Sequence, residues 1–307
     1  MKDQGLLIVG TGAMACLFAA RLAAAGVSIT MWGRWADGVA ALRRHGVRIL
    51  EMDGSEHTFP VRVVDDPDEL GVISDALVLV KSWQTERAAL GLVKKLSADG
   101  LAISLQNGLG NGEILADHLG SERVAVGTMT LGAYLTEPVK VCPTWEGMIS
   151  LGMHPRINRL ESMLREAGFA VQKLADITSL LWGKLVINAA INPLTALLQV
   201  LNGKLLDRPV IQELFLAAAC EAAAVAAAQG INLPYPDPVL AVTEIARRTA
   251  TNRSSMLQDL LRGTPSEIDV INGAIVQAGE RAGVPTPVNQ ILWQLVRAAE
   301  ESKQDTI

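Results

Sequence analysis

The 307-residue chain is 50% hydrophobic and 19% charged, enough apolar material for a substantial core and enough length for two domains. Its net charge of −5 gives no general attraction to nucleic acid or to an anionic membrane, so we expect neither as a partner. Cys16, Cys142 and Cys220 lie far apart, without CxxC spacing or adjacent histidines, which predicts reduced core thiols and no metal site. The short apolar stretch at the N-terminus cannot form the h-region of a signal peptide, and we predict a cytoplasmic protein.

A glycine-rich turn follows the first predicted strand, residues 6–9, and precedes a predicted helix that ends near residue 25. In this turn Gly10 permits a tight bend and Gly12 lets the backbone approach a pyrophosphate, while the helix N-terminus offers N–H groups and a positive dipole end. The third fingerprint position is Ala15 rather than glycine, which is tolerable because it governs helix–strand packing. The order of strand, turn and helix predicts a dinucleotide site.

The second predicted strand, residues 28–32, ends at Arg34, where NAD-binding proteins usually carry an acidic residue for the ribose 2′-hydroxyl. A guanidinium suits a 2′-phosphate instead, which favours NADP(H) with Arg34 as the selector. The alternative is an ordinary exposed arginine.

Further predicted strands cover residues 51–64, as a hairpin-like pair, then 76–80 and 101–105. Lys81 and Asn107 follow the last two, and ligands of open α/β sheets lie beyond the carboxyl ends of strands. Both residues are therefore candidates for nicotinamide and ribose contacts, or else loop residues without a ligand. Residues 125–151 predict antiparallel strands that extend the same sheet. The fold class is α/β, with a Rossmann-type domain over 1–174 and an all-helical domain over 175–307.

The predicted helix over residues 176–199 carries Lys184, Asn188 and Asn192 at intervals of four, which places them in one polar stripe. Burying an ammonium and two amides among apolar residues costs several kcal/mol unless something pairs with them. A polar ligand is the expected partner, and a solvated surface lysine is the alternative. The same polar residues and Pro193 argue against a membrane span.

A proton donor for carbonyl reduction can be sought by elimination. Neither tyrosine has a lysine four residues later, as short-chain dehydrogenases require, and all four histidines lie in the first predicted domain. Lys184 is the lysine within a buried stripe, where desolvation lowers the pKa of an ammonium, so we predict it as the donor.

Two helical features leave alternatives open. Thr264 and Glu267 fit a capping box with Pro265 at the first helical position, so Glu267 is either a cap, a functional carboxylate or both. The alanine-rich helix over residues 210–229 suits close packing against neighbouring helices or a homodimer interface.

Over nearly its whole length the chain resembles the ketopantoate reductase family. The motifs that carry the resemblance are, in family order, GTGAMA, Arg34, VKSWQT, QNGLG, GTMTLGA, WGKLVINAAINPLTAL, SSMLQD and EIDVINGAI. The resemblance implies NADPH-dependent reduction of 2-dehydropantoate (ketopantoate) to (R)-pantoate, a step toward pantothenate and coenzyme A, with the substrate held between a Rossmann-type and a helical domain.

The resemblance also implies roles for residues. Lys184 is the general acid, and the implied substrate contacts are Asn107, Lys184, Asn188, Asn192, Asn202 and Ser255, with residues 252–254 as further candidates beside Ser255. The implied NADP(H) contacts are Gly10, Thr11, Gly12, Ala13, Met14, Ala15, Arg34, Lys81, Asn107, Ala133 and Glu267.

Two other functions stay open. One is an NADPH-dependent reductase of another branched 2-oxo acid, which relative kcat/KM values would distinguish. The other is a non-catalytic NADP(H) sensor, against which Lys184 argues because a sensor has no need to bury an acid. In each enzymatic case the partner is a small-molecule 2-oxo acid.

Overall fold

The computed structural model describes residues 5–145 and 147–304 of the chain. The chain divides into two compact units, Met1–Gln106 with Asn111–Ile177, and Asn107–Gly110 with Thr178–Ile307. The predicted division assigned residues 107–110 to the first domain, and the structure corrects this. The reason is hydrogen bonding, since Leu109 N–H donates to the carbonyl of Val270 over 3.1 Å.

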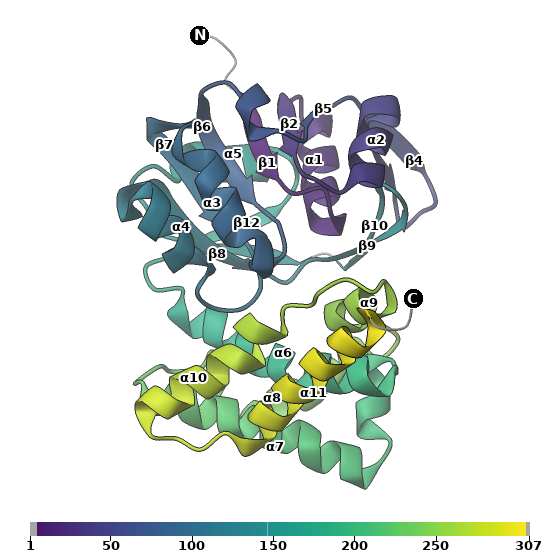
Figure 1. Cartoon of the computed structure of the whole chain (residues 1–307), viewed down its shortest axis with the longest axis vertical. Coiled ribbons are helices and arrows are strands. Elements are labelled where there is room, and N and C mark those ends of the chain that lie inside the picture. Colours follow the sequence, from purple (N-terminus) through teal and green to yellow (C-terminus); the bar gives the residue numbers. More distant parts are fainter. Residues whose placement is uncertain (1–4, 146, 305–307) are drawn as a thin grey trace. The chain divides into compact units, whose positions relative to one another are not determined.

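The first unit is built on an eight-stranded, mostly parallel sheet (Figure 1). From one edge to the other its strands are β12 (Ala170–Leu174), β11 (Met148–Gly152), β8 (Val124–Met129), β7 (Leu96–Ser104), β6 (Ile73–Val78), β1 (Leu6–Val9), β2 (Ile29–Trp32) and β5 (Arg62–Val64). The chain runs outward from β1 to β2 and β5, then returns to the other side of β1 with β6. The carboxyl end of β1 is therefore a topological switch point, where doubly wound sheets bind ligands.

Helices cover both faces of this sheet, because its central strands are apolar on both sides. Leu6 and Ile8 of β1 pack in one apolar cluster, whereas the intervening Leu7 and Val9 pack in another. The helices of this unit are α1 (Ala13–Ala24), α2 (Ala36–His45), α3 (Thr85–Val93), α4 (Asn111–Leu119) and α5 (Asn158–Glu166). The predicted Rossmann-type architecture is confirmed.

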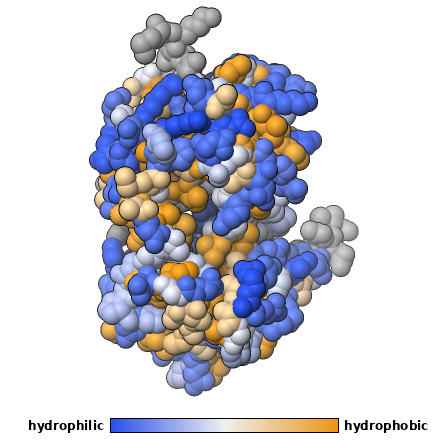
Figure 2. All heavy atoms as spheres, turned by 90° about the vertical axis from the view of Figure 1, so that its left-hand side faces the viewer, coloured by the Kyte–Doolittle hydropathy of each residue, from blue (hydrophilic) through white to orange (hydrophobic). Residues whose placement is uncertain are grey.

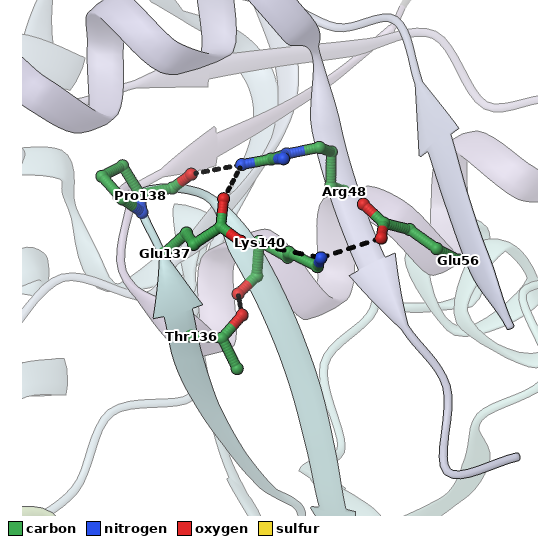
Figure 3. Close-up of polar contacts among 6 residues, drawn as sticks. All are labelled: Arg48, Glu56, Thr136, Glu137, Pro138 and Lys140. Atoms are coloured by element: carbon green, nitrogen blue, oxygen red, sulfur yellow. Dashed lines mark hydrogen bonds and ion pairs between the residues drawn. The ribbon is translucent and has the colours of Figure 1, made fainter. Parts of the chain in front are cut away.

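A second sheet of four strands also belongs to this unit, in the order β4 (Glu56–Phe59), β3 (Val47–Leu50), β10 (Lys140–Trp145) and β9 (Gly132–Glu137). Residues 125–151 were predicted to extend the main sheet with antiparallel strands, and this is only partly right. Strand β8 joins the sheet parallel to β7, β11 pairs antiparallel with β8, and β9 and β10 belong to the second sheet. Charged side chains link the strands of the second sheet (Figure 3): Lys140 Nζ lies 2.8 Å from Glu56 Oε2, and Arg48 contacts Glu137 at 3.0 Å. Each pair joins a strand on one side of the β3–β10 junction to a strand on the other side, and a linear sequence does not reveal these contacts.

The second unit is helical, as predicted. Its α-helices are α6 (Thr178–Leu198), α7 (Pro209–Ala228), α8 (Pro238–Arg248), α9 (Ser255–Leu261), α10 (Asn272–Ala282) and α11 (Pro287–Gln304). Its apolar core includes Trp182, Val186 and Ala190 of α6 together with Phe215 of α7 and Leu257 of α9. The helix that carries the polar stripe is therefore the central element of this unit.

Two helices, α6 and α7, are long and apolar enough to cross a membrane by length and composition alone, a test that core helices also pass. In α6, 67% of the most apolar window is buried inside the protein, so packing in the core accounts for its hydrophobicity; in α7 the share is 33%. On the face drawn in Figure 2, hydrophobic patches alternate with hydrophilic residues.

The three cysteines are free thiols, as predicted, but not all lie in the core. Cys16 and Cys142 are buried, whereas Cys220 on α7 is exposed. The alanine-rich sequence around Cys220 does not show which face of α7 is turned inward, because nearly every residue there is small or apolar.

Candidate active site

The glycine turn lies between the ends of β2 and β6. Gly10 N–H donates to the Trp32 carbonyl over 2.7 Å, and Leu79 N–H donates to the Val9 carbonyl over 2.9 Å. Gly10 has a φ of +134°, and a Cβ at this position would lie 3.0 Å from the Leu79 carbonyl oxygen. The bend therefore requires glycine at residue 10.

Gly12 borders open space at the start of α1. It is the N-cap residue of this helix, and a Cβ built on it would meet no protein atom within 4 Å. The glycine is thus not needed for packing within the protein. Open space beside the free N–H groups of a helix N-terminus fits the pyrophosphate of a dinucleotide.

The other residues of the turn hold its shape. Thr11 is buried, and its side chain packs closely on Gly33. A Cβ built on Gly33 would lie 2.6 Å from the Thr11 side chain. The Cys16 thiol donates to the Thr11 carbonyl over 3.6 Å. Ala13 and Met14 are half-buried in the first turn of α1, and Ala15 is fully buried in the core. A methyl group at the third fingerprint position is accommodated by this packing.

Arg34 is exposed just beyond β2, and Arg87 in the first turn of α3 is near enough to interact with it electrostatically. Partial burial and the positive charge of Arg34 both lower the pKa of Arg87. Helix α3 packs against β2 at Gly91, where a Cβ would overlap the indole of Trp32. A cation near a helix N-terminus is electrostatically unfavourable, and a bound anion between the two guanidinium groups would offset this.

Lys81 follows β6 and is half-buried. The backbone beside it is held by Gln106, whose Nε2 donates to the Val80 carbonyl over 2.9 Å and to Thr85 Oγ1 over 2.8 Å. Ser104 Oγ in turn donates to Gln106 Oε1 over 3.0 Å. Gln106 was missed as a supporting residue, although its position at the end of a buried strand was a usable signal.

Ala133 lies on β9, in the second sheet, opposite Pro143 of β10. It is half-buried and packs against the apolar cluster that includes α1. The glycine turn, by contrast, follows a strand of the main sheet.

In the second unit, Lys184, Asn188 and Asn192 all lie on α6, as the predicted stripe requires. Lys184 and Asn188 are half-buried and Asn192 is buried. Burial lowers the pKa of the Lys184 ammonium to about 8, whereas the carboxylate of Glu267 acts in the opposite direction. An ammonium with this pKa is a competent proton donor near neutral pH.

Glu267 is buried, with 5% of its surface exposed, and accepts a hydrogen bond from Asn107 Nδ2 over 2.9 Å. Glu267 also acts on Lys184 by raising its pKa, and all three residues belong to the second unit. Segment 107–110 therefore contributes a side chain to the α6 site.

The predicted capping box at Thr264 and Glu267 is wrong. No helix begins at Pro265; the next elements are a 3₁₀ turn over Ile268–Val270 and then α10. The Ser266 hydroxyl accepts from Ile268 N–H over 3.2 Å, and Thr264 Oγ1 donates to the Asp259 carbonyl over 3.2 Å. The local pattern fits a cap, but the Glu267 carboxylate has a long-range partner in Asn107 instead.

Asn202 and Ser255 come from elements that neighbour α6. Asn202 begins a 3₁₀ turn over Asn202–Leu206 and donates through Nδ2 to Thr249 Oγ1 over 2.9 Å. Its Oδ1 is buried and has no hydrogen-bond partner among the described residues, so it can accept from a ligand or a water. Ser255 is half-buried at the first position of α9.

Ser254, suggested as a further carboxylate ligand, has a structural role. Its hydroxyl caps α9 by accepting from Leu257 N–H over 3.1 Å, and it also accepts from Thr195 Oγ1 over 2.7 Å. Tyr235, missed from the sequence, donates to the Gly183 carbonyl over 2.9 Å, directly before Lys184. Both contacts fix α6 relative to its neighbours.

Among residues 5–145 and 147–304, no three or more His, Cys, Asp or Glu side chains are grouped so that they could hold a metal ion.

Two family models match the chain. Residues 6–156 match "Ketopantoate reductase PanE/ApbA", and residues 176–300 match "Ketopantoate reductase PanE/ApbA C terminal". A 2-dehydropantoate 2-reductase of Archaeoglobus fulgidus is 36% identical over 307 residues, with 98% of this chain and 99% of the relative covered. The corresponding protein of Vibrio cholerae is 30% identical, with 97% and 99% covered.

Solved structures agree in fold. A PanE/ApbA family ketopantoate reductase from Ralstonia eutropha JMP134 superposes with a TM-score of 0.91 at 32% identity, covering 98% of this chain and 99% of the other. A D-mandelate dehydrogenase determined with NADH and anilino(oxo)acetate also has a TM-score of 0.91, at 25% identity and with 97% and 99% covered.

Proposed function

The chain belongs to the ketopantoate reductase family, and from this premise we propose that it reduces 2-dehydropantoate to (R)-pantoate with NADPH. The observation that carries the proposal is Lys184, an ammonium whose pKa is lowered to about 8 on a helix with two further polar residues in line. The curated relatives named 2-dehydropantoate 2-reductase support the choice of substrate.

Lys184 is the proposed general acid. Bound NADPH would supply the hydride for the carbonyl carbon of the substrate. The Lys184 ammonium gives a proton to the carbonyl oxygen, which leaves an alcohol and a neutral lysine. Solvent then returns the proton to Lys184. Glu267 favours the charged lysine, so it opposes the effect of burial and keeps enough of the acid form near neutral pH.

The neighbouring polar residues bind and orient the 2-oxo acid in this proposal. Asn188 and Asn192 hold its oxygens from α6, and the unpartnered Oδ1 of Asn202 accepts from a substrate hydroxyl. Ser255 holds the carboxylate. Amide and hydroxyl groups on packed helices lose little freedom on binding, which favours a defined orientation of the carbonyl.

The proposed cofactor site uses the glycine turn for the pyrophosphate and Arg34 for the 2′-phosphate. Arg87 is a second cation beside Arg34 and supports a doubly charged phosphate there. Lys81 and Asn107 complete the contacts to the nicotinamide half, together with Glu267 and Ala133. Asn107 contacts both ligands in this proposal, and its Nδ2 group also donates to Glu267 over 2.9 Å.

A second candidate substrate is another 2-oxo acid. This candidate is supported by the D-mandelate dehydrogenase structure of the same fold, which was determined with NADH and anilino(oxo)acetate. A non-catalytic NADP(H) sensor is disfavoured, because it would gain nothing from an ammonium with a lowered pKa. A cytoplasmic location and a homodimer stay predictions.

The test is NADPH oxidation, followed by absorbance, with ketopantoate, 2-oxoisovalerate and pyruvate as separate substrates. The proposal expects ketopantoate to have the highest kcat/KM. A preference for either of the other acids would assign the second candidate. Binding of NADPH without turnover of any of the three would overturn the proposed reaction.

A further inference from the structure

Helix α6 contains a break in its backbone hydrogen bonding at the centre of the proposed substrate site. Pro193 lies inside the helix, one residue after Asn192. In an α-helix the N–H of residue 193 would donate to the carbonyl of residue 189, but proline has no N–H and its ring crowds that carbonyl. Ala189 is fully buried, so water does not replace the missing donor.

Asn272 supplies this donor from another helix. It is the first residue of α10, it is fully buried, and its Nδ2 lies 3.1 Å from the Ala189 carbonyl oxygen. The same nitrogen donates to Asn289 Oδ1 over 3.0 Å. Both hydrogens of the Asn272 amide are therefore used, one of them on the interrupted carbonyl.

The direction of this hydrogen bond is determined by the residues behind Asn272. Asn289, also fully buried, donates through Nδ2 to the Ala218 carbonyl over 3.0 Å and to Glu221 Oε2 over 2.8 Å. A carbonyl and a carboxylate only accept, so the Asn289 amide must turn its nitrogen toward them and its oxygen toward Asn272. The Asn272 amide must then present its nitrogen to both Asn289 and Ala189.

Glu221 is itself anchored at the start of α11. Its two carboxylate oxygens accept from the N–H groups of Val288 and Asn289, each over 2.9 Å. A carboxylate at a helix N-terminus is well placed both for these bonds and for the helix dipole. A chain of hydrogen bonds therefore runs from Glu221 through Asn289 and Asn272 to the backbone of α6.

We propose that Asn272 is a positioning residue for the reaction, which replaces the helix hydrogen bond lost at Pro193 and so keeps Asn188 and Asn192 in line with Lys184. This inference rests on the proposed function for the role of the stripe. Ala189 directly follows Asn188 and lies one turn before Pro193, so a carbonyl left without a donor would let the helix bend between the two asparagines. Asn272 touches none of the reacting groups.

The test uses Asn272→Ala and Pro193→Ala, alone and together. Asn272→Ala is expected to lower kcat/KM for the 2-oxo acid at least tenfold, with the NADPH Kd changed less than twofold. Pro193→Ala gives α6 an N–H for Ala189, so adding Asn272→Ala to it should cost less than threefold. Gln277→Ala, an exposed amide on the same helix, is the matched control and should have no effect.

Amide hydrogen exchange over residues 188–195 provides a readout that does not depend on turnover. Exchange should be faster in Asn272→Ala and return toward the parent rate in the double variant. If the two substitutions are simply additive in both kcat/KM and exchange, the proposal is overturned. If the parent turns over no 2-oxo acid but exchange shows the rescue, the proposed function fails while the role of Asn272 in α6 stands. Should Asn272→Ala not fold, a folded double variant supports the proposal and an unfolded one contradicts it.

Discussion

The glycine turn and helix α6 show two different ways of building a polar site. In the turn the backbone makes the site, because Gly10 needs a positive φ and Gly12 leaves space beside the helix N-terminus. The side chains of residues 11 and 15 are buried within the protein. In α6 the side chains make the site, and Asn272 of α10 donates the hydrogen bond that the helix backbone lacks at Ala189. The turn should therefore be sensitive to added atoms, and α6 to removed functional groups.

Removal of the Lys184 ammonium tests the side-chain half of this comparison most strongly. Lys184→Ala should reduce kcat by ~10²-fold or more, the contribution typical of a positioned acid, with NADPH affinity nearly unchanged. Steady-state kinetics and an NADPH titration measure both quantities. Lys204→Ala removes an exposed lysine of the same unit and should leave kcat intact. An unchanged kcat in Lys184→Ala would show that another group donates the proton.

Arg34 extends the comparison, because the proposed cofactor site also depends on one side chain besides the backbone of the glycine turn. Arg34→Ala should raise the Kd of NADPH roughly tenfold to a hundredfold. This range follows because a charge-assisted hydrogen bond contributes about 1.5–3 kcal/mol to binding. The Kd of NADH, which lacks the 2′-phosphate, should barely change. Arg87→Ala should follow the same pattern with a smaller effect, and Arg44→Ala, an exposed arginine on α2, is the control. Equal losses for both cofactors would contradict selection by Arg34.

An added methyl group tests the backbone half. Gly12→Ala meets no protein atom, so the melting temperature should stay constant, while the Kd of NADPH rises about tenfold because the methyl fills the pyrophosphate space. Gly71→Ala, also in open space but far from the turn in sequence, is the matched control for the substitution itself. Unimpaired NADPH binding by Gly12→Ala would mean that the pyrophosphate does not approach this residue.

The pH dependence sharpens the role of Lys184. Its pKa of about 8 means that the ammonium is the main form below pH 8 and is lost as the pH rises. The rate of carbonyl reduction should therefore fall about fivefold between pH 8 and pH 9, as the acid form declines. The residual activity of Lys184→Ala should not show this fall in rate between pH 8 and pH 9. A rate that rises across the same interval would identify a base as the limiting group.

The smallest effect is expected at the end of α6, away from the stripe. Gln199 is exposed and has a φ of +53°, and Val200 N–H donates back to the Thr195 carbonyl over 3.2 Å, which is a helix ending that favours glycine. Gln199→Gly should stabilise the protein by about 0.5–1 kcal/mol in urea unfolding, with kcat unchanged. A loss of stability would show that the Gln199 side chain makes a stabilising contact.

Elements that depend on neighbouring residues in the sequence were predicted correctly. The glycine turn follows from strand, bend and helix in sequence, and α6 follows from its periodicity. The capping box at Glu267 failed because the same pattern fits a carboxylate whose partner, Asn107, lies 160 residues away. The second sheet was missed for a related reason: alternating strands over residues 125–151 do not reveal that β10 pairs with β3.

The role of Asn272 was also missed, although a signal was present. Pro193 interrupts a helix predicted to be buried, and such a break requires a donor from elsewhere. Sequence alone shows the need for that donor but not its source, since α10 begins far along the chain. Exposure of Cys220 was unpredictable because an alanine-rich helix has no distinct polar face.

Segment 107–110 has a consequence for the timing of folding during synthesis. Its four residues interrupt the first unit in sequence, yet their hydrogen-bond partners, Glu267 and Val270, come much later in the chain. At roughly 5–20 residues per second, about 8–30 s pass between translation of Asn107 and of Glu267. A nascent chain can therefore form the eight-stranded sheet before segment 107–110 has its hydrogen-bond partners. Asn107 is held in place only after the second unit has been synthesised.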